Sequence, residues 1–234
     1  MVTVNITNKL DYLSDEAYKS LRANLMFCGK DKKAIALTSC TPSEGKSAVS
    51  MNLCISLAEA GYRVLLIDAD LRNSMLLGRV QVREKVKGLA HFLSNQAQLN
   101  DIICMTNIPR FHMIFAGPVP PNPAELLGTN LFSGLVSTMK RAYDFVIIDT
   151  PPLGRVIDCA VIAQCCDGVM MVIESEAISY RFAQEVKNQL EKTKCPILGV
   201  ILNKVDQDKN GYYGKYGKYG KYGSYGQYGK HKEA

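Results

Sequence analysis

The sequence has few of the residue patterns that hold metal ions or disulfide bonds. Its three histidines show no metal-ligand or catalytic-triad spacing, and no two cysteines form a Cys-x-x-Cys pair. The eight cysteines occupy positions 28, 40, 54, 104, 159, 165, 166 and 195. Cys165 and Cys166 are adjacent, which suits neither a tetrahedral metal site nor an unstrained disulfide. Most cysteines lie in apolar runs, so we expect reduced thiols in a cytoplasmic protein.

Long hydrophobic runs are also absent from the sequence. Residues 1–10 mix polar and apolar side chains and lack the apolar block of a signal peptide. No run approaches the roughly 18 apolar residues that a membrane-spanning helix needs. We therefore expect a cytoplasmic chain that reaches a membrane only through a partner.

Net charge is low outside the C-terminal end of the chain. The formal charge of the 234 residues is +6, and residues 209–234 contain six lysines and one acid. The remainder is nearly neutral, so it lacks the basic surface of a nucleic-acid-binding domain. A Lys/Tyr/Gly segment has the stacking and charge chemistry to bind single strands, but it would not explain the nucleotide site below. No nucleic-acid partner is expected.

Apolar, β-branched runs alternate with helix-like segments before residue 206. Strands are predicted near residues 34–39, 63–68, 111–115, 144–149, 168–173 and 197–203, and helices near 14–27, 46–60, 89–93, 123–142 (with a break), 159–164 and 181–192. Because the strands are apolar throughout, they are expected to be buried on both faces, as in parallel sheets. The alternation predicts a doubly wound α/β fold, with ligands at the carboxyl ends of a mostly parallel sheet.

The composition changes abruptly after Asp206. Residues 211–230 repeat Tyr-Gly-x without an aliphatic side chain, and so much glycine makes an ordered backbone entropically costly. We predict three parts: a helical N-terminal part in residues 1–30, an α/β domain in 31–206 and a disordered tail in 207–234.

A phosphate-binding loop is predicted between the first strand and the next helix. Residues 40–47 match the P-loop pattern Gly-x-x-x-x-Gly-Lys-Ser/Thr, with Cys40 in place of the first glycine. In this pattern Gly45 lets backbone N–H groups approach the phosphates, Lys46 adds positive charge and Ser47 offers a hydroxyl to Mg²⁺. The predicted nucleotide-binding residues of this loop are Thr41, Pro42, Ser43, Glu44, Gly45, Lys46, Ser47 and Ala48.

Two further apolar strands end in aspartates. Asp68 and Asp70 end the run VLLIDAD, and alternate residues of an extended chain face the same way, so both carboxylates can enter one site. Asp149 ends the run FVIID, a usual source of a magnesium contact in P-loop proteins. The three strand ends together predict a site that binds a nucleotide with Mg²⁺.

These motifs resemble the bacterial tyrosine kinases of capsule and exopolysaccharide synthesis, over nearly the whole chain. The matching segments are TPSEGKS, LLIDADLR, VIIDTPP, GPVPPNPAELL and the tyrosine cluster at the C-terminal end. The family's P-loop NTPase fold is related to the MinD and ParA ATPases, whose extra signature lysine is replaced here by Thr41. The resemblance implies a protein-tyrosine kinase that uses ATP.

The resemblance also implies roles for individual residues. Lys46 would contact the phosphates, while Ser47, Asp70 and Asp149 would surround Mg²⁺. Asp68 would be the general base for the tyrosine hydroxyl, which must lose its proton as the bond forms. Asp68 and Asp70 could exchange these roles, so the predicted catalytic residues are Lys46, Asp68 and Asp70.

Glu16, Lys19 and Arg22 resemble the family's Glu-x-x-Arg-x-x-Arg motif for ring-like self-association, with lysine in place of the first arginine. Without the family, the three-residue spacing describes a solvated charged face of a helix, and lysine cannot reproduce a bidentate arginine contact. The resemblance implies a homo-oligomer through residues 1–30 and a cognate tyrosine phosphatase. It also implies a membrane-anchored activator, a separate polypeptide, that recruits the chain to the inner face of the cell membrane.

Seven of the twelve tyrosines lie in the tail: Tyr212, Tyr213, Tyr216, Tyr219, Tyr222, Tyr225 and Tyr228. The resemblance implies that the kinase phosphorylates them, in trans. A coil of about 20 residues averages near 25 Å in span and extends to roughly 65 Å, which reaches a neighbouring chain. Each phosphate adds about −1.5 to −2 charge, so the tail is predicted to act as an electrostatic switch.

Two alternatives remain open from the sequence. A MinD/ParA-like ATPase switch without a protein substrate shares the fold, although the tyrosine tail and the missing lysine disfavour it. Residues 203–206, Asn-Lys-Val-Asp, match the pattern with which GTPases read guanine. The resemblance favours ATP instead and adds Asn203, as an adenine contact or strand cap, to the predicted nucleotide-binding residues.

Overall fold

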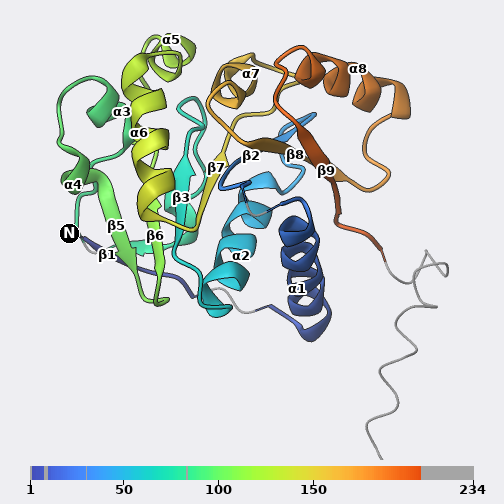
Figure 1. Ribbon diagram of the computed structural model, residues 1–234, viewed down its shortest axis with the longest axis horizontal. Helices are drawn as coiled ribbons and strands as arrows, with labels where there is room; N and C mark the ends of the chain where they lie inside the picture. Colours follow the sequence, from blue (N-terminus) through green and yellow to red (C-terminus); the bar gives the residue numbers. More distant parts are fainter. Residues whose placement is uncertain (1, 8–9, 30, 83, 207–234) are drawn as a thin grey trace, which may run out of the picture.

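In the computed structural model, residues 2–7, 10–29, 31–82 and 84–206 are described, and nine strands of these segments form one sheet (Figure 1). The strand order is β4-β1-β5-β6-β3-β7-β2-β8-β9. The strands are β1 (Thr3–Asn5), β2 (Ala34–Ser39), β3 (Val64–Asp68), β4 (Gln81–Val82), β5 (Ile103–Thr106), β6 (Phe111–Ile114), β7 (Phe145–Asp149), β8 (Gly168–Glu174) and β9 (Ile197–Asn203). The pairs β1/β4 and β5/β6 are antiparallel, and the others are parallel, which confirms the mostly parallel sheet.

Helices cover both faces of the sheet. The helices are α1 (Tyr12–Phe27), α2 (Lys46–Glu59), the 3₁₀ helix η1 (Leu77–Arg79), α3 (Leu89–Leu93), α4 (Leu99–Ile102), α5 (Pro123–Leu127), α6 (Asn130–Ala142), α7 (Asp158–Ala163) and α8 (Tyr180–Glu191). Figure 1 shows α1 beside α2, while α6, α7 and α8 lie over other parts of the sheet. The fold is therefore doubly wound, as predicted.

The sheet separates two hydrophobic cores, one on each of its faces. Ile35 and Leu37 of β2 pack in the core that contains residues of α1 and α2. Ala34 and Ala36, the alternate positions of the same strand, pack in the core that contains residues of α3, α5, α6, α7 and α8. Because each central strand supplies both cores, it is apolar at every position, which is the pattern that the sequence shows.

Most predicted elements are present, but one side of the sheet was missed. The six predicted strands lie within one residue of their observed bounds, and the break in the 123–142 segment lies at Gly128 and Thr129. β1, β4 and β5 were not predicted. β1 pairs with β5 and β4, so residues 3–5 belong to the sheet, although the prediction grouped residues 1–30 as a helical part.

All eight cysteines are free thiols, as predicted. Among the described residues, no helix combines the length and the apolar character that crossing a membrane requires. The predicted tail in residues 207–234, with its seven tyrosines, lies outside the described residues.

Candidate active site

The predicted site residues meet at three adjacent strand ends. β3, β7 and β2 are parallel neighbours in the sheet, so their carboxyl ends lie at one edge. Asp68 and Asp149 are directly paired in register, and the P-loop follows β2. A cavity of about 740 Å³ opens there. Among its lining residues are Pro42, Ser43, Glu44, Gly45, Lys46, Ser47, Ala48, Asp70 and Asn203, so every predicted nucleotide-binding residue except Thr41 lines it.

The Glu44 side chain bonds back to the start of the P-loop. Its Oε2 accepts hydrogen bonds from the backbone N–H of Cys40 (2.7 Å) and of Thr41 (2.8 Å). Burial raises the pKa of the Cys40 thiol to about 12, with the Glu44 charge adding to the effect, so the thiol stays protonated. The cysteine in place of the first glycine is therefore accommodated as a buried apolar group.

The end of β9 braces the P-loop from outside. The Asn203 side-chain amide donates to the Glu44 carbonyl (2.9 Å), and the Lys204 ammonium donates to the Ser43 carbonyl (2.8 Å). Gly45 is the N-cap of α2 with φ +87°, and a Cβ there would lie 2.1 Å from Asn203 Nδ2. Position 45 thus requires glycine for both its backbone angle and its neighbour.

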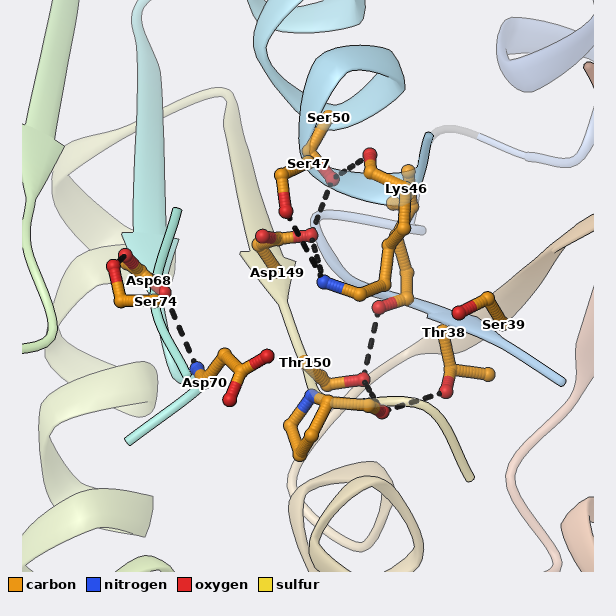
Figure 2. A network of polar contacts seen from close by, with 12 residues as sticks. Thr38, Ser39, Lys46, Ser47, Ser50, Asp68, Asp70, Ser74, Asp149 and Thr150 are labelled. Carbon is orange, nitrogen blue, oxygen red and sulfur yellow. Dashed lines mark hydrogen bonds and ion pairs between the residues drawn. The ribbon is translucent and has the colours of Figure 1, made fainter. Parts of the chain in front are cut away.

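The Lys46 side chain lies against Asp149, the last residue of β7 (Figure 2). Its Nζ is 2.9 Å from Asp149 Oδ1 and 3.3 Å from Ser47 Oγ. The same Asp149 oxygen accepts a hydrogen bond from Ser50 Oγ at 3.0 Å. Both members of the ion pair are buried, so each charge is compensated by the other.

Asp68 and Asp70 have different surroundings, which the sequence did not distinguish. Asp68 is 1% exposed and accepts hydrogen bonds from the Ser74 hydroxyl and the Asp70 backbone N–H. Burial raises the pKa of Asp68 to about 7, and the neighbouring Asp149 charge adds to the rise. Asp70 lines the cavity, and one of its oxygens accepts from the N–H groups of Arg72 and Asn73. Asp70 is thus the carboxylate of this pair that faces the cavity.

An arginine–aspartate pair that the sequence analysis missed anchors the second acidic motif. Arg72 donates through Nε (2.8 Å) and Nη2 (2.9 Å) to both oxygens of Asp158, which is buried at the start of α7. No spacing rule connects residues 86 positions apart, so this pair had no sequence signal. Ser50 was also missed, although it lies one helical turn after Lys46 and the i, i+4 spacing could have indicated it.

The oxygen donors at the site suit Mg²⁺. The Ser47 hydroxyl and the carboxylates of Asp70 and Asp149 are hard ligands, which this ion prefers. Within the described segments, no cluster of three or more His, Cys, Asp or Glu side chains could hold a metal ion alone. Magnesium commonly binds through one or two carboxylates together with the phosphates of a nucleotide, so the residues present fit such an ion.

The predicted self-association residues lie on α1, away from this cavity. Lys19 forms ion pairs with Asp15 and Glu16, both at 2.8 Å. Arg22 Nη1 donates to the carbonyl (2.5 Å) and the hydroxyl (3.0 Å) of Ser56 on α2. These contacts are made within one chain, and Glu16 and Lys19 remain exposed.

Comparison with known proteins agrees with the fold. Residues 32–197 match the AAA domain family. The tyrosine-protein kinase CpsD of Streptococcus agalactiae is 44% identical over 207 residues, which cover 86% of this chain and 90% of that protein. The crystal structure of the chimerical protein CapA2B2 superposes with a TM-score of 0.80 at 30% identity, covering 88% of this chain and 95% of that one. The septum site-determining protein MinD of Pyrococcus horikoshii, complexed with Mg-ADP, superposes with a TM-score of 0.64 at 27% identity, covering 76% and 72%. This chain therefore belongs to the bacterial tyrosine-protein kinases.

Proposed function

We propose that this tyrosine-protein kinase transfers the γ-phosphate of ATP to tyrosines of its own C-terminal tail, between neighbouring chains. The observation that carries the proposal is the meeting of Lys46, Asp68 and Asp70 at adjacent strand ends beside the P-loop cavity. The proposed acceptors are Tyr212, Tyr213, Tyr216, Tyr219, Tyr222, Tyr225 and Tyr228.

Each site residue has a proposed task that follows from its surroundings. Lys46 leaves Asp149 and binds the phosphates, where its charge stabilises the transition state. Ser47, Asp70 and Asp149 would hold Mg²⁺, which neutralises charge on the phosphates when it is bound. Asp68 is the proposed acceptor of the tyrosine proton, because its pKa of about 7 suits a base that works near neutral pH. Asp70, which lines the cavity where Asp68 does not, is the alternative base.

The proposed nucleotide is ATP. The guanine-reading pattern at residues 203–206 requires an available Asn203 amide, and this amide donates to the Glu44 carbonyl of the P-loop. A bracing role for Asn203 therefore accounts for the residue without a guanine contact. An ATPase switch without a protein substrate is disfavoured by the identity with tyrosine-protein kinases.

The partners follow the same proposal. Chains associate in a ring through Glu16, Lys19 and Arg22 on α1, and a membrane-anchored activator recruits them to the inner face of the cell membrane. A tyrosine phosphatase reverses the tail modification, and the cycle regulates the synthesis and export of capsular polysaccharide or exopolysaccharide. Support for this part is the chain's family membership and the exposed positions of Glu16 and Lys19.

Lys46→Met tests the proposed chemistry. The variant should lose autophosphorylation by several orders of magnitude, because the charge on the transition-state phosphate oxygens is lost. Labelled ATP followed by phosphate mapping measures the loss, and circular dichroism checks the fold. Lys87→Met is the matched control, because Lys87 is exposed in an ion pair with Asp101 and does not line the cavity. Activity of Lys46→Met close to that of the control would refute the assignment.

A further inference from the structure

Two hollows lie against α1 beside the catalytic cavity, and we call them together the α1 groove. Its first part is a hollow of about 370 Å³ between α1 and β9, the last strand of the sheet. Asn203 and Lys204 line both this hollow and the catalytic cavity, so the two lie side by side. Its aliphatic lining residues are Leu13, Ala17, Leu21, Val49, Ile201, Leu202 and Val205. Leu13 and Leu202 are more than half exposed, at 58% and 51%, so the hollow presents apolar surface to solvent.

The second part of the α1 groove is a hollow lined by acidic residues. This hollow has a volume of about 350 Å³, lies between α1 and α2, and shares Tyr18 with the first. Asp11, Asp15 and Glu59 line it, and no lysine or arginine does. Lys19 offsets the charge of Asp15. Within the described part of the chain, Asp11 and Glu59 form no ion pair, so the hollow carries net negative charge.

We propose that this α1 groove, from Leu13 and Leu202 to Asp11 and Glu59, binds the unphosphorylated tail of a second copy of the chain. The inference rests on the proposed function and adds a docking site for its substrate. The aliphatic part suits tyrosine rings, and the acidic part suits lysines, which recur every three residues at 215, 218 and 221. Because the first hollow lies beside the cavity, with Asn203 and Lys204 lining both, one tyrosine enters the cavity while neighbouring repeats occupy the groove.

The negative charge of the groove makes docking depend on whether the tail is phosphorylated. The segment 209–234 has six lysines and one acid, so it is attracted to Asp11 and Glu59 before modification. Each added phosphate contributes about −1.5 to −2 charge, so a few phosphates reverse the sign of the tail. The modified tail is then repelled by the acidic hollow. The charge of the groove therefore predicts that the tail is released after several phosphate transfers.

The test uses full-length chains in two roles. The acceptor is the Lys46→Met chain, which keeps its tyrosines. The enzyme is a chain with phenylalanine at all seven tail tyrosines, so that every transfer is to the acceptor. Into the enzyme we introduce Glu59→Lys and Leu13→Ser together. The KM for the acceptor should rise about tenfold, with kcat within about twofold, because one exposed charge pair and one apolar contact are lost.

Controls separate docking from damage. Glu125→Lys with Met105→Ser changes an exposed acid and an exposed apolar residue far from the groove, and it should leave the KM unchanged. A short neutral peptide, acetyl-Gly-Tyr-Gly-amide, reaches only the cavity, so its kcat/KM should be equal in all enzymes. Light scattering should show equal particle sizes for the groove variant and its parent.

Four results would overturn the inference. An unchanged KM for the acceptor excludes docking in the groove. An equal loss with the short peptide means that the substitutions damage the cavity, and a smaller particle means that the groove is a contact between folded domains. Absence of transfer to either substrate by the parent enzyme would remove the proposed function, and the docking site with it.

Discussion

The position of Asp68 in the sheet sets the pKa of its side chain. It lies at the end of β3, directly beside Asp149 of β7, and only 1% of its surface is exposed. Loss of hydration and the second carboxylate both oppose its ionisation, which raises its pKa from the ordinary 3.8 to about 7. Because the folded chain disfavours the ionised form of Asp68, this carboxylate is a better proton acceptor. For the same reason its ionisation lowers the free energy of unfolding.

Asp68→Asn should therefore have opposite effects on activity and stability. For an aspartate whose pKa is raised on folding, the folded chain binds the extra proton between the two pKa values. The contribution of Asp68 to the free energy of unfolding is thus highest at low pH and falls as the pH rises from about 4 to about 7, by a few kcal/mol. Asparagine carries no charge, so the variant should lose activity by orders of magnitude and gain about 5 °C in Tm at pH 8.

Thermal unfolding without nucleotide or Mg²⁺ measures this effect, and the comparison between two pH values is its control. At pH 5 the wild-type carboxyl is mostly protonated, so the two chains should melt at nearly the same temperature. A variant that is less stable than the wild type at pH 8, or equally shifted at both pH values, would show that Asp68 is not held in a raised-pKa state.

Individual site residues could be predicted where a local pattern encodes their position. Lys46 and Ser47 follow from the P-loop spacing, and Asp68, Asp70 and Asp149 follow from apolar runs that end in an acid. The partners of these residues could not be predicted, because tertiary contacts select them. Asp158 meets Arg72 only because α7 packs beside the second acidic motif, and that contact has no local pattern.

At the scale of elements, the P-loop and the end of β9 act as one unit. Asn203 and Lys204 hold the carbonyl groups of Glu44 and Ser43, which leaves the backbone N–H groups at the start of α2 directed to a ligand. The close approach of Asn203 to Gly45 makes the shape of the loop depend on a strand about 160 residues away. Neither dependence is visible in the loop sequence.

Gly45→Ala should weaken nucleotide binding strongly, and Gly61→Ala is its matched control. Both glycines have positive φ, +87° and +92°, so alanine costs roughly 1–2 kcal/mol of backbone strain at either position. A Cβ at position 45 also meets Asn203 at 2.1 Å, whereas nothing lies within 4 Å of one at position 61.

Isothermal titration with ATP and Mg²⁺ measures the difference between these two variants. Gly61→Ala should bind nucleotide like the wild type with a slightly lower Tm, whereas Gly45→Ala should show binding weakened by 100-fold or more, on the order of 3 kcal/mol. Equal binding by the two variants would contradict the bracing role of Asn203.

The strands with long apolar runs could be predicted, and the short strands at one margin of the sheet could not. β2, β3, β7 and β8 are apolar at successive positions because both cores use them, which gives a strong signal. β1 and β4 have three and two residues and lie at one margin of the sheet, so their sequences are too short to show a period. β5 has four residues, of which Met105 is exposed, and it follows α4 directly, so no turn residue marks its start.

At the scale of the whole molecule, the proposal joins self-association to tail modification. Replacing all seven tail tyrosines with phenylalanine should give a larger particle than the phosphorylated wild type, because phosphotyrosines repel one another and the acidic surfaces of neighbouring chains. Lys19→Ala in that background should reduce the particle to a monomer. Light scattering measures both, and Lys187→Ala, which removes a comparable exposed ion pair on α8, is the control. Equal particle sizes across these chains would exclude α1 as the contact between copies.

The central claim is that one chain phosphorylates the tail of another, and a mixing experiment tests it most directly. The full-length Lys46→Met chain is the acceptor, and the full-length chain with phenylalanine at the seven tail positions is the enzyme. With labelled ATP and Mg²⁺, the account predicts phosphate on Tyr212 to Tyr228 of the acceptor, at an initial rate that rises with acceptor concentration. Label that is absent from the acceptor, while the wild-type chain alone still becomes phosphorylated, would contradict transfer between chains.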